Sequence, residues 1–328
     1  MKRSFLVALS FAAPMAVVAQ TIVFNDTFGS GNATVQSATP QPPTANSTAF
    51  EYFQQGANPT TPTIAPGDLH LAGRTTSSSI SEVQALFSTT PVTLTTIGDY
   101  LELTIVFTDT QNIFPAGSAS TLNIGLYNSG ASSPVKGVRL DSTGSGTGGA
   151  IGWNGYLARI GGTGGAVSEF ITRVPQGPGL TNPNQSQDVL FNVASGSSTF
   201  NNPLGTAIGP TTQFAAGLTA GSVYTLDFWI TLSGANTLTL NNNLYSGGSV
   251  GGTPLFTDVG TASGATYLTS AYDAFAFGWR YNSTSAANSV DISSITVANG
   301  TVPEPTTLAL SVIGGLGLLV MRCRKHRM

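Results

Sequence analysis

The sequence has few of the residues on which metal centres and covalent cross-links depend. Its single cysteine is Cys323, and its two histidines are His70 and His326. Residues 20–301 therefore contain no disulfide, and a zinc site, which takes several Cys or His ligands, is not expected. No cofactor is expected either. The glycine-rich run 161–165 is followed by no Lys-Ser/Thr pair, which a phosphate-binding loop requires.

Charge is also scarce, and basic charge especially so. Charged residues make up 8% of the chain, and residues 21–301 hold six basic against fourteen acidic side chains, a formal net charge of −8. Such a balance disfavours nucleic acid and anionic surfaces as partners. It also leaves no basic strip of the kind that binds polyanionic glycans.

A helical period is missing almost throughout, and alternation of apolar and polar residues takes its place. The one candidate for a helical turn is Ser81–Phe87, with Ser81 as its cap. The alternating pattern predicts strands at Tyr100–Thr108, Ser222–Ser233, Tyr272–Asn282, 122–126, 238–240 and Val290–Val297, with a turn at Ser233–Asn236 and a bulge at Ser293-Ser294.

Many strands separated by turn residues predict an all-β fold, an antiparallel β-sandwich of jelly-roll type. We expect a single sandwich domain over residues 20–298, with a further strand at Ala49–Phe53, followed by a short linker at 299–302. The Gly/Ser/Thr stretch Asp141–Ala150 is expected to be a flexible loop.

The N-terminus carries an export signal. Met1-Lys2-Arg3 is a basic start, and Phe5–Val18 is a short apolar run. Small residues at 17 and 19 predict cleavage by signal peptidase after Ala19, so residues 1–19 form a signal peptide.

The C-terminus, residues 303–328, has three parts in a fixed order. Pro303, Glu304 and Pro305 come first, and an uncharged stretch at 306–321 follows. In a helix this stretch reaches roughly 24 Å, somewhat short of a bilayer core, so it predicts a single transmembrane helix with basic residues snorkelling at its end. By the positive-inside rule the basic tail stays in the cytoplasm; its residues are Arg322, Arg324, Lys325 and Arg327.

These three parts together resemble the PEP-CTERM sorting signal. The resemblance implies recognition of Pro303-Glu304-Pro305 by an exosortase, a membrane enzyme similar to a transpeptidase. It further implies a precursor anchored in the inner membrane and a mature form at the cell surface or outside the cell.

The body of the chain is similar to concanavalin A-like (LamG-type) jelly rolls. The segments that carry this likeness are Phe24–Phe28, Gly125–Asn128, Gly155–Arg159, Tyr224–Leu226 and Phe277–Trp279. The resemblance implies a sandwich, and domains of this kind often bind carbohydrate on a concave sheet face.

No catalytic residue is predicted, and we expect no enzyme. A glycan-cleaving sandwich needs two carboxylates about 5–10 Å apart. The glutamates of the body, namely Glu51, Glu82, Glu102 and Glu169, do not pair on any one strand. His70 lies on the outward face of a short strand with no catalytic partner near it in sequence. Asn25-Asp26 or Asp258 could contribute to a calcium site, but scattered loop aspartates are common.

Trp229 and Asp227 are the candidate ligand-binding residues. They lie on the strand face opposite Tyr224, Phe228 and Ile230, among polar neighbours. An aromatic ring beside a carboxylate suits a sugar ligand, whereas the alternative is that Trp229 packs under a loop or at a sheet edge. Trp279 is expected in the core.

Three hypotheses follow. The first is a non-catalytic exported protein of the cell surface or extracellular matrix, with polysaccharide as its candidate ligand. The second is a secreted polysaccharide-degrading hydrolase or lyase on the same fold, which a pair of carboxylates in a groove would favour. The third is a purely structural matrix or adhesive protein without a pocket.

Overall fold

The computed structural model describes residues 20–29, 50–54, 63–73, 79–130, 153–165, 167–174, 189–191, 205–281 and 287–302. The predicted signal peptide with Ala19, the motif at 303–305, the helix at 306–321, the basic tail and the loop Asp141–Ala150 lie outside these residues. Within them, no helix has the length and apolar character needed to span a membrane.

The described elements are nearly all strands. In chain order they are β1 (Thr21–Asp26), β2 (Phe50–Gln54), β3 (Thr63–Ala65), β4 (Asp68–Ala72), β5 (Ser79–Leu86), β6 (Val92–Thr93), β7 (Asp99–Asp109), β8 (Thr121–Asn128), β9 (Asn154–Gly161), β10 (Ser168–Arg173), β11 (Ala207–Thr212), β12 (Ser222–Gly234), β13 (Thr237–Ser246), β14 (Phe256–Ser263), the 3₁₀ turn η1 (Gly264–Thr266), β15 (Ala271–Tyr272), β16 (Ala274–Tyr281) and β17 (Ser289–Thr301).

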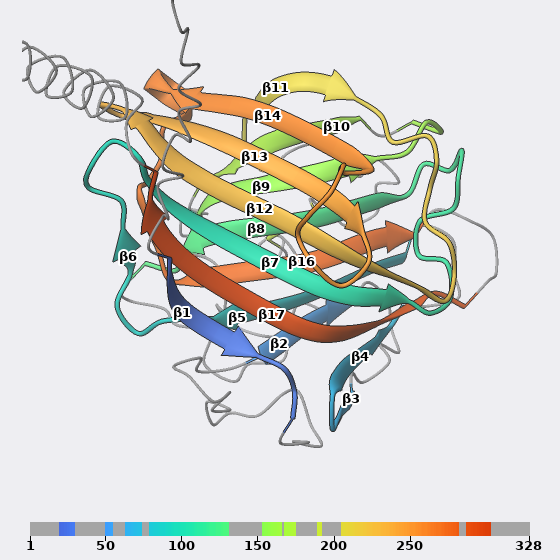
Figure 1. Ribbon diagram of the computed structural model, residues 1–328. Helices are drawn as coiled ribbons and strands as arrows, with labels where there is room; N and C mark the ends of the chain where they lie inside the picture. Colours follow the sequence, from blue (N-terminus) through green and yellow to red (C-terminus); the bar gives the residue numbers. More distant parts are fainter. Residues whose placement is uncertain are drawn as a thin grey trace, which may run out of the picture.

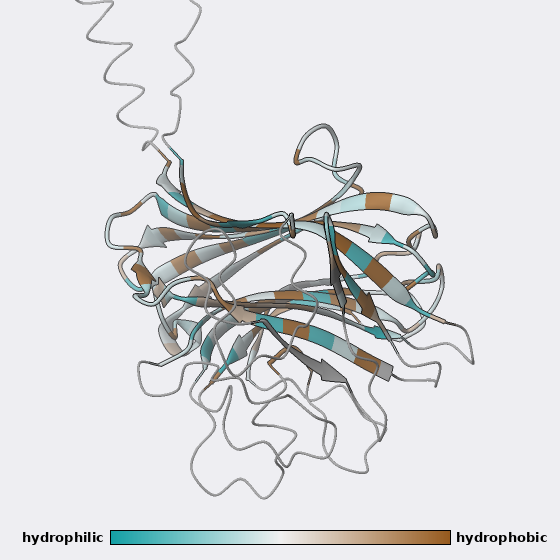
Figure 2. Cartoon of the chain, turned by 90° about the horizontal axis from the view of Figure 1, so that it is seen from below, coloured by the Kyte–Doolittle hydropathy of each residue, from teal (hydrophilic) through white to brown (hydrophobic). Residues whose placement is uncertain are grey.

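These strands form two antiparallel sheets packed face to face (Figures 1 and 2). Sheet A has the order β14-β13-β12-β7-β17-β4-β3, with β1 also paired to β17, and sheet B has the order β11-β10-β9-β8-β16-β5-β2. The short β15 and β6 form a separate ribbon. The predicted all-β sandwich is confirmed.

Alternation decides which side chains enter the core between the sheets. On β7, Leu101, Leu103, Ile105 and Phe107 are fully buried while the intervening residues are partly exposed. Figure 2 shows this alternation of apolar and polar residues along the strands. Rings from the two sheets meet in the middle, with Phe107 and Phe277 5.5 Å apart at their centroids. Truncating one such ring to alanine costs about 3–5 kcal/mol.

Three local predictions are confirmed. The pairing of β17 with β7 shifts between Ile292 and Ser294, where a bulge was expected. β12 and β13 are joined by a tight turn, in which Asn236 has φ 53°, a left-handed conformation that asparagine tolerates. Trp279 is buried, and its Nε1 donates to Asn288 Oδ1 at 2.8 Å.

Two predictions were wrong. Ser81–Phe87 is not a helical turn: residues 81–86 belong to β5, whose residues from Ile80 to Leu86 are all buried. A strand covered on both faces loses the alternation that would identify it, so its sequence was ambiguous. Residues 299–301, expected in a linker, are the end of β17, because Thr301 still pairs with Asp99 of β7.

Candidate functional site

The outer face of sheet A gathers polar and aromatic side chains from three adjacent strands. On β7 and β12, Glu102 lies opposite Trp229, and Thr104 lies opposite Asp227. On β13, Asn243 lies opposite Asp227, and Tyr245 lies opposite Thr225. We call this surface the platform; it consists of Tyr100, Glu102, Thr104, Asp227, Trp229, Asn243 and Tyr245.

Glu102 and Asp227 form a carboxylate pair at the centre of the platform. They are diagonal neighbours on adjacent strands and hydrogen-bond to each other. Burial raises the pKa of Asp227, of which 2% is exposed, and the charge and hydrogen bond of Glu102 raise it further. Hydrogen bonds from Asn243 and from Thr104, whose Oγ1 lies 3.4 Å from Asp227 Oδ1, act in the opposite direction. A protonated Asp227 can thus donate to Glu102.

The aromatic rings beside this pair are packed against each other as well as facing outwards. Trp229 is half-buried and meets Tyr100 edge-on, with ring centroids 6.2 Å apart. Burial raises the pKa of Tyr100 and of Tyr245, and nearby carboxylate charge adds to the effect in both. Within the described part of the chain, Trp229 Nε1 has no hydrogen-bond partner. Because Nε1 is buried, the platform offers only the exposed part of the indole ring, next to the partly exposed Glu102.

One end of the platform is covered by the connection between β13 and β14, which crosses in front of β12 and β7 in Figure 1. Gly247 N donates to Val223 O at 2.9 Å, and Thr225 Oγ1 donates to Gly247 O at 2.8 Å. These bonds hold the connection against β12. A ligand on the platform would therefore meet Trp229 and Glu102 rather than Thr225.

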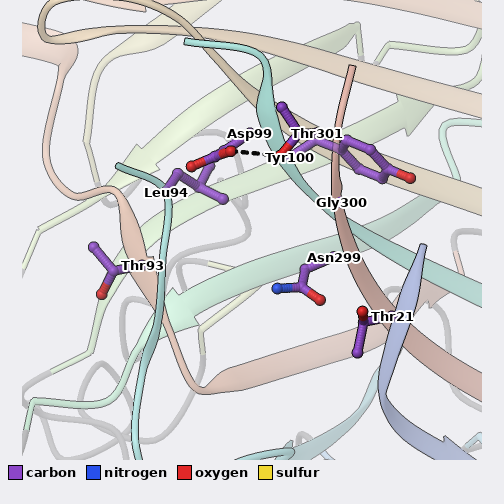
Figure 3. Close-up of a pocket in the computed structure, with 8 residues that line it drawn as sticks. All are labelled: Thr21, Thr93, Leu94, Asp99, Tyr100, Asn299, Gly300 and Thr301. Atoms are coloured by element: carbon purple, nitrogen blue, oxygen red, sulfur yellow. Dashed lines mark hydrogen bonds between the residues drawn. The ribbon is translucent and has the colours of Figure 1, made fainter. Parts of the chain in front are cut away.

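A cleft of about 330 Å³ lies at the end of sheet A where β7, β17 and β1 meet, shown in Figure 3. We call it the terminal cleft; it is lined by Thr21, Thr93, Leu94, Asp99, Tyr100, Asn299, Gly300 and Thr301. Tyr100 borders both surfaces, but Asp99, Asn299 and Thr301 share the strand face of Leu101, which is opposite to that of Glu102. The volume lies at the lower end of the range for small-molecule sites, and the lining is rich in hydroxyl groups.

Asp99 organises the cleft. Its Oδ2 accepts hydrogen bonds from the backbone nitrogens of Thr95 and Thr96 at 2.9 and 2.8 Å, and its Oδ1 accepts one from Thr301 Oγ1 at 2.7 Å (Figure 3). Burial opposes ionisation of Asp99, but these hydrogen bonds outweigh it and lower its pKa. The carboxylate is therefore engaged with the protein itself.

The predicted ligand-binding residues lie on one face, as expected, and the structure adds a partner for them. The sequence placed Asp227 and Trp229 on the same side of one strand. It did not show that Glu102, which pairs with no other glutamate on its own strand, lies diagonally across from Asp227. The missing information was the pairing of β7 with β12, whose residues are about 120 positions apart in the chain.

The other candidate residues contact neighbouring residues of the protein or face its core. His70 Nδ1 lies 2.5 Å from Asp291 Oδ1 on the paired strand β17, in a partly exposed pair. Asp26 accepts a hydrogen bond from the backbone of Phe28, and Asp258 faces the core. Among the described residues, no group of three or more Asp, Glu, His or Cys side chains is placed to hold a metal ion.

The outer face of sheet B is covered instead of open. Val189–Phe191 lies across it, and Glu82 accepts hydrogen bonds from the backbone nitrogens of Val189 and Leu190, both at 3.2 Å. The rings of Trp153 and Tyr127 pack beside this segment, tilted by 37° with centroids 5.6 Å apart. Trp153 is fully buried, as is Tyr156, so neither ring is available to stack on a sugar.

The carboxylate pair is not arranged like that of a glycosidase. Retaining and inverting enzymes separate their two carboxyl groups by about 5–10 Å, so that a glycosidic bond or a water molecule fits between them. Asp227 is buried and interacts directly with Glu102, so the two groups are not arranged around an open space that a glycosidic bond could enter. The geometry supports proton sharing and hydrogen bonding to a ligand.

Comparison with solved structures gives matches to lectins over most of the chain. Peanut lectin with a 9mer peptide matches at 10% identity and a TM-score of 0.37, covering 88% of this chain and all of that one. The carbohydrate recognition domain of Emp47p matches at 8% identity and 0.39, with 87% and 99% covered. Basic winged bean lectin with Tn-antigen matches at 12% and 0.39, with 87% and 100% covered. At these values the likeness transfers no ligand to this chain.

The sequence comparisons concern the C-terminus alone. No curated protein matches the chain. The model of the PEP-CTERM protein-sorting motif matches residues 301–325, starting at the last residue of β17 and including Pro303, Glu304 and Pro305. The chain carries a PEP-CTERM protein-sorting motif at its C-terminus.

Proposed function

We propose that this chain is an exported protein that an exosortase-like enzyme sorts to the cell surface or extracellular matrix, where its sandwich binds carbohydrate without cleaving it. The observation that carries the sorting part is the match of residues 301–325 to the PEP-CTERM motif. The apolar stretch and the basic tail that follow Pro305 agree with it. Signal peptidase and the inner membrane are further partners of the precursor.

The carbohydrate part rests on the chemistry of the platform and the terminal cleft. An indole, two carboxylates, amides and several threonine hydroxyls are adjacent there, and such groups can stack on a sugar ring and hydrogen-bond its hydroxyls. The net charge of −8 between residues 21 and 301 favours neutral or basic saccharides over polyanions.

A second candidate is a structural matrix protein that binds no small ligand. The low exposure of Asp227 and the packing of Trp229 on Tyr100 favour it, because both side chains are largely engaged within the protein. The polysaccharide-degrading enzyme has no such support, since Asp227 is buried and engaged with Glu102.

Processing and ligand binding can be tested separately. Replacing Pro303, Glu304 and Pro305 by alanine should leave the protein unprocessed in the inner membrane, as seen by fractionation and immunoblotting. Normal release of this variant would refute the sorting proposal.

A glycan array with the released protein tests the second part. Binding without turnover supports a carbohydrate-binding function, and Trp229→Ala should weaken it about tenfold, or 1.4 kcal/mol. Val259→Ala, an exposed residue on the edge strand β14, is the matched control. Degradation of a glycan would favour the enzyme, and an empty array would favour the structural protein.

A further inference from the structure

Both described ends of the domain leave sheet A at the same corner. Thr21 of β1 pairs with Asn299 of β17, and Gln20 and Val302 are the described residues just beyond. Figure 1 shows β1 and the end of β17 side by side. Pro303, the first residue of the Pro-Glu-Pro tripeptide, thus follows directly after Val302, two residues beyond the end of β17.

Hydrogen bonds fix the chain in front of the motif as far as Val302, the last described residue. Val302 N donates to Gly98 O at 2.8 Å, and Gly98 N donates to Leu232 O at 2.8 Å. Thr301 is bound to Asp99 as described above. The turn at 96–98 is therefore fixed against the chain directly in front of Pro303.

Connectivity then limits how far a partner can stay from this corner. An extended chain advances at most about 3.6 Å per residue, so Pro303–Pro305 lies within roughly 11 Å of Val302. A protein that grips these three residues in its active site meets the folded domain at the turn 96–98 and the neighbouring strand ends.

Exposed apolar side chains lie at this corner beside the polar lining of the terminal cleft. Eight large hydrophobic side chains are exposed in the described part of the chain, and three of them belong to the segments that meet here: Ile22 at 62%, Ile97 at 46% and Val302 at 42% exposed. Single exposed apolar residues are ordinary, but three on adjoining segments beside a partner's target are typical of a contact surface. We call these three residues the root surface.

We propose that the root surface is a docking surface for the membrane-embedded sorting enzyme that acts on the PEP-CTERM motif. This inference rests on the proposed sorting function and adds to it that the enzyme contacts the folded domain as well as the motif. The bilayer is a poorer occupant, because the net charge of −8 between residues 21 and 301 opposes an anionic leaflet.

The test uses the full chain in a host that contains the sorting enzyme. Ile97→Asp and Ile22→Asp should each slow tail removal at least about fivefold in a pulse-chase experiment, a loss typical of an interface contact. Val259→Asp, 48% exposed at the far edge of sheet A, should be processed at the normal rate. Unchanged processing of both root-surface variants would overturn the docking proposal.

A second measurement identifies the occupant. A photo-crosslinking amino acid at position 97 should form an adduct with the enzyme in cells whose enzyme is catalytically inactive. Adducts with lipid alone would overturn the proposal in favour of the bilayer. The alanine variant of Pro303-Glu304-Pro305 separates the two proposals: if it is processed normally, sorting itself fails. If it is blocked while Ile97→Asp is not, only the docking surface fails.

Discussion

The outer faces of the two sheets differ in how far they are exposed to solvent. On sheet A, polar residues alternate with core residues, and the platform is left partly open to solvent. On sheet B, Val189–Phe191 covers the face and forms a second apolar cluster with Ile80, Tyr127, Trp153, Leu157 and Ile171. The same fold thus has one face available for binding and one committed to stability. Substitutions of like residues on the two faces should therefore have unlike effects.

Tryptophan offers the largest contrast. Trp153→Ala on sheet B should lower the free energy of unfolding by about 3–5 kcal/mol, because a fully buried ring is lost. Trp229→Ala on sheet A should cost less, about 1 kcal/mol, since part of the indole is exposed to solvent. Urea denaturation of both variants measures the difference. Equal losses would show that the platform is part of the core.

Replacing a glutamate on each sheet should give a smaller difference in stability between the two faces. Glu82→Ala should cost about 2–3 kcal/mol, because two buried backbone N–H groups lose their acceptor. Gly278 contributes to this site, since a Cβ there would lie 2.4 Å from Ser81 O and 2.9 Å from Glu82 Cα. Glu102→Ala should change stability by less than about 1 kcal/mol, and a large loss in that variant would contradict the distinction.

The buried aspartates predict how the free energy of unfolding depends on pH. Burial is the largest cause that raises the pKa of Asp26, Asp109, Asp227, Asp258 and Asp273, that of Asp258 to about 6. A group whose pKa rises on folding stabilises most below its unfolded value, near 4, and loses that contribution as the pH rises through its folded value.

Stability should therefore increase as the pH falls from 8 to 5. Asp227→Asn should reduce this dependence by on the order of 1–2 kcal/mol, whereas Thr104→Ala should leave most of it. Urea midpoints between pH 5 and 8 provide the measurement. A midpoint that stays level or falls on acidification would contradict the raised pKa values of the buried aspartates.

The smallest effect is expected away from both surfaces. His70→Ala removes a partly exposed pair with Asp291 and should change the free energy of unfolding by about 0–1 kcal/mol. Thermal unfolding at pH 6 and pH 8 would detect a larger role. A loss above that range would indicate that the β4–β17 contact contributes more to the free energy of unfolding than its exposure suggests.

Features that depend on the residue pattern within a single strand could be predicted from the sequence. The long strands, the bulge at Ser293-Ser294, the turn before Thr237 and the core position of Trp279 all follow from local pattern. Pairing between distant strands has no local signal, so the contact of Glu102 with Asp227 could not be predicted. β5 was missed because both its faces are buried, and a covered strand shows no alternation.

The position of β17 in sheet A has a mechanical consequence. Its Asn299 pairs with Leu101 of β7 on one side and with Thr21 of β1 on the other, so the strand that leads to the motif is an interior one. A pull on the chain beyond Val302 therefore enters the middle of the sheet and is shared by two ladders of hydrogen bonds. An edge strand such as β14 could be peeled away one bond at a time. Attachment through β17 suits a domain that must stay folded while it is held under tension.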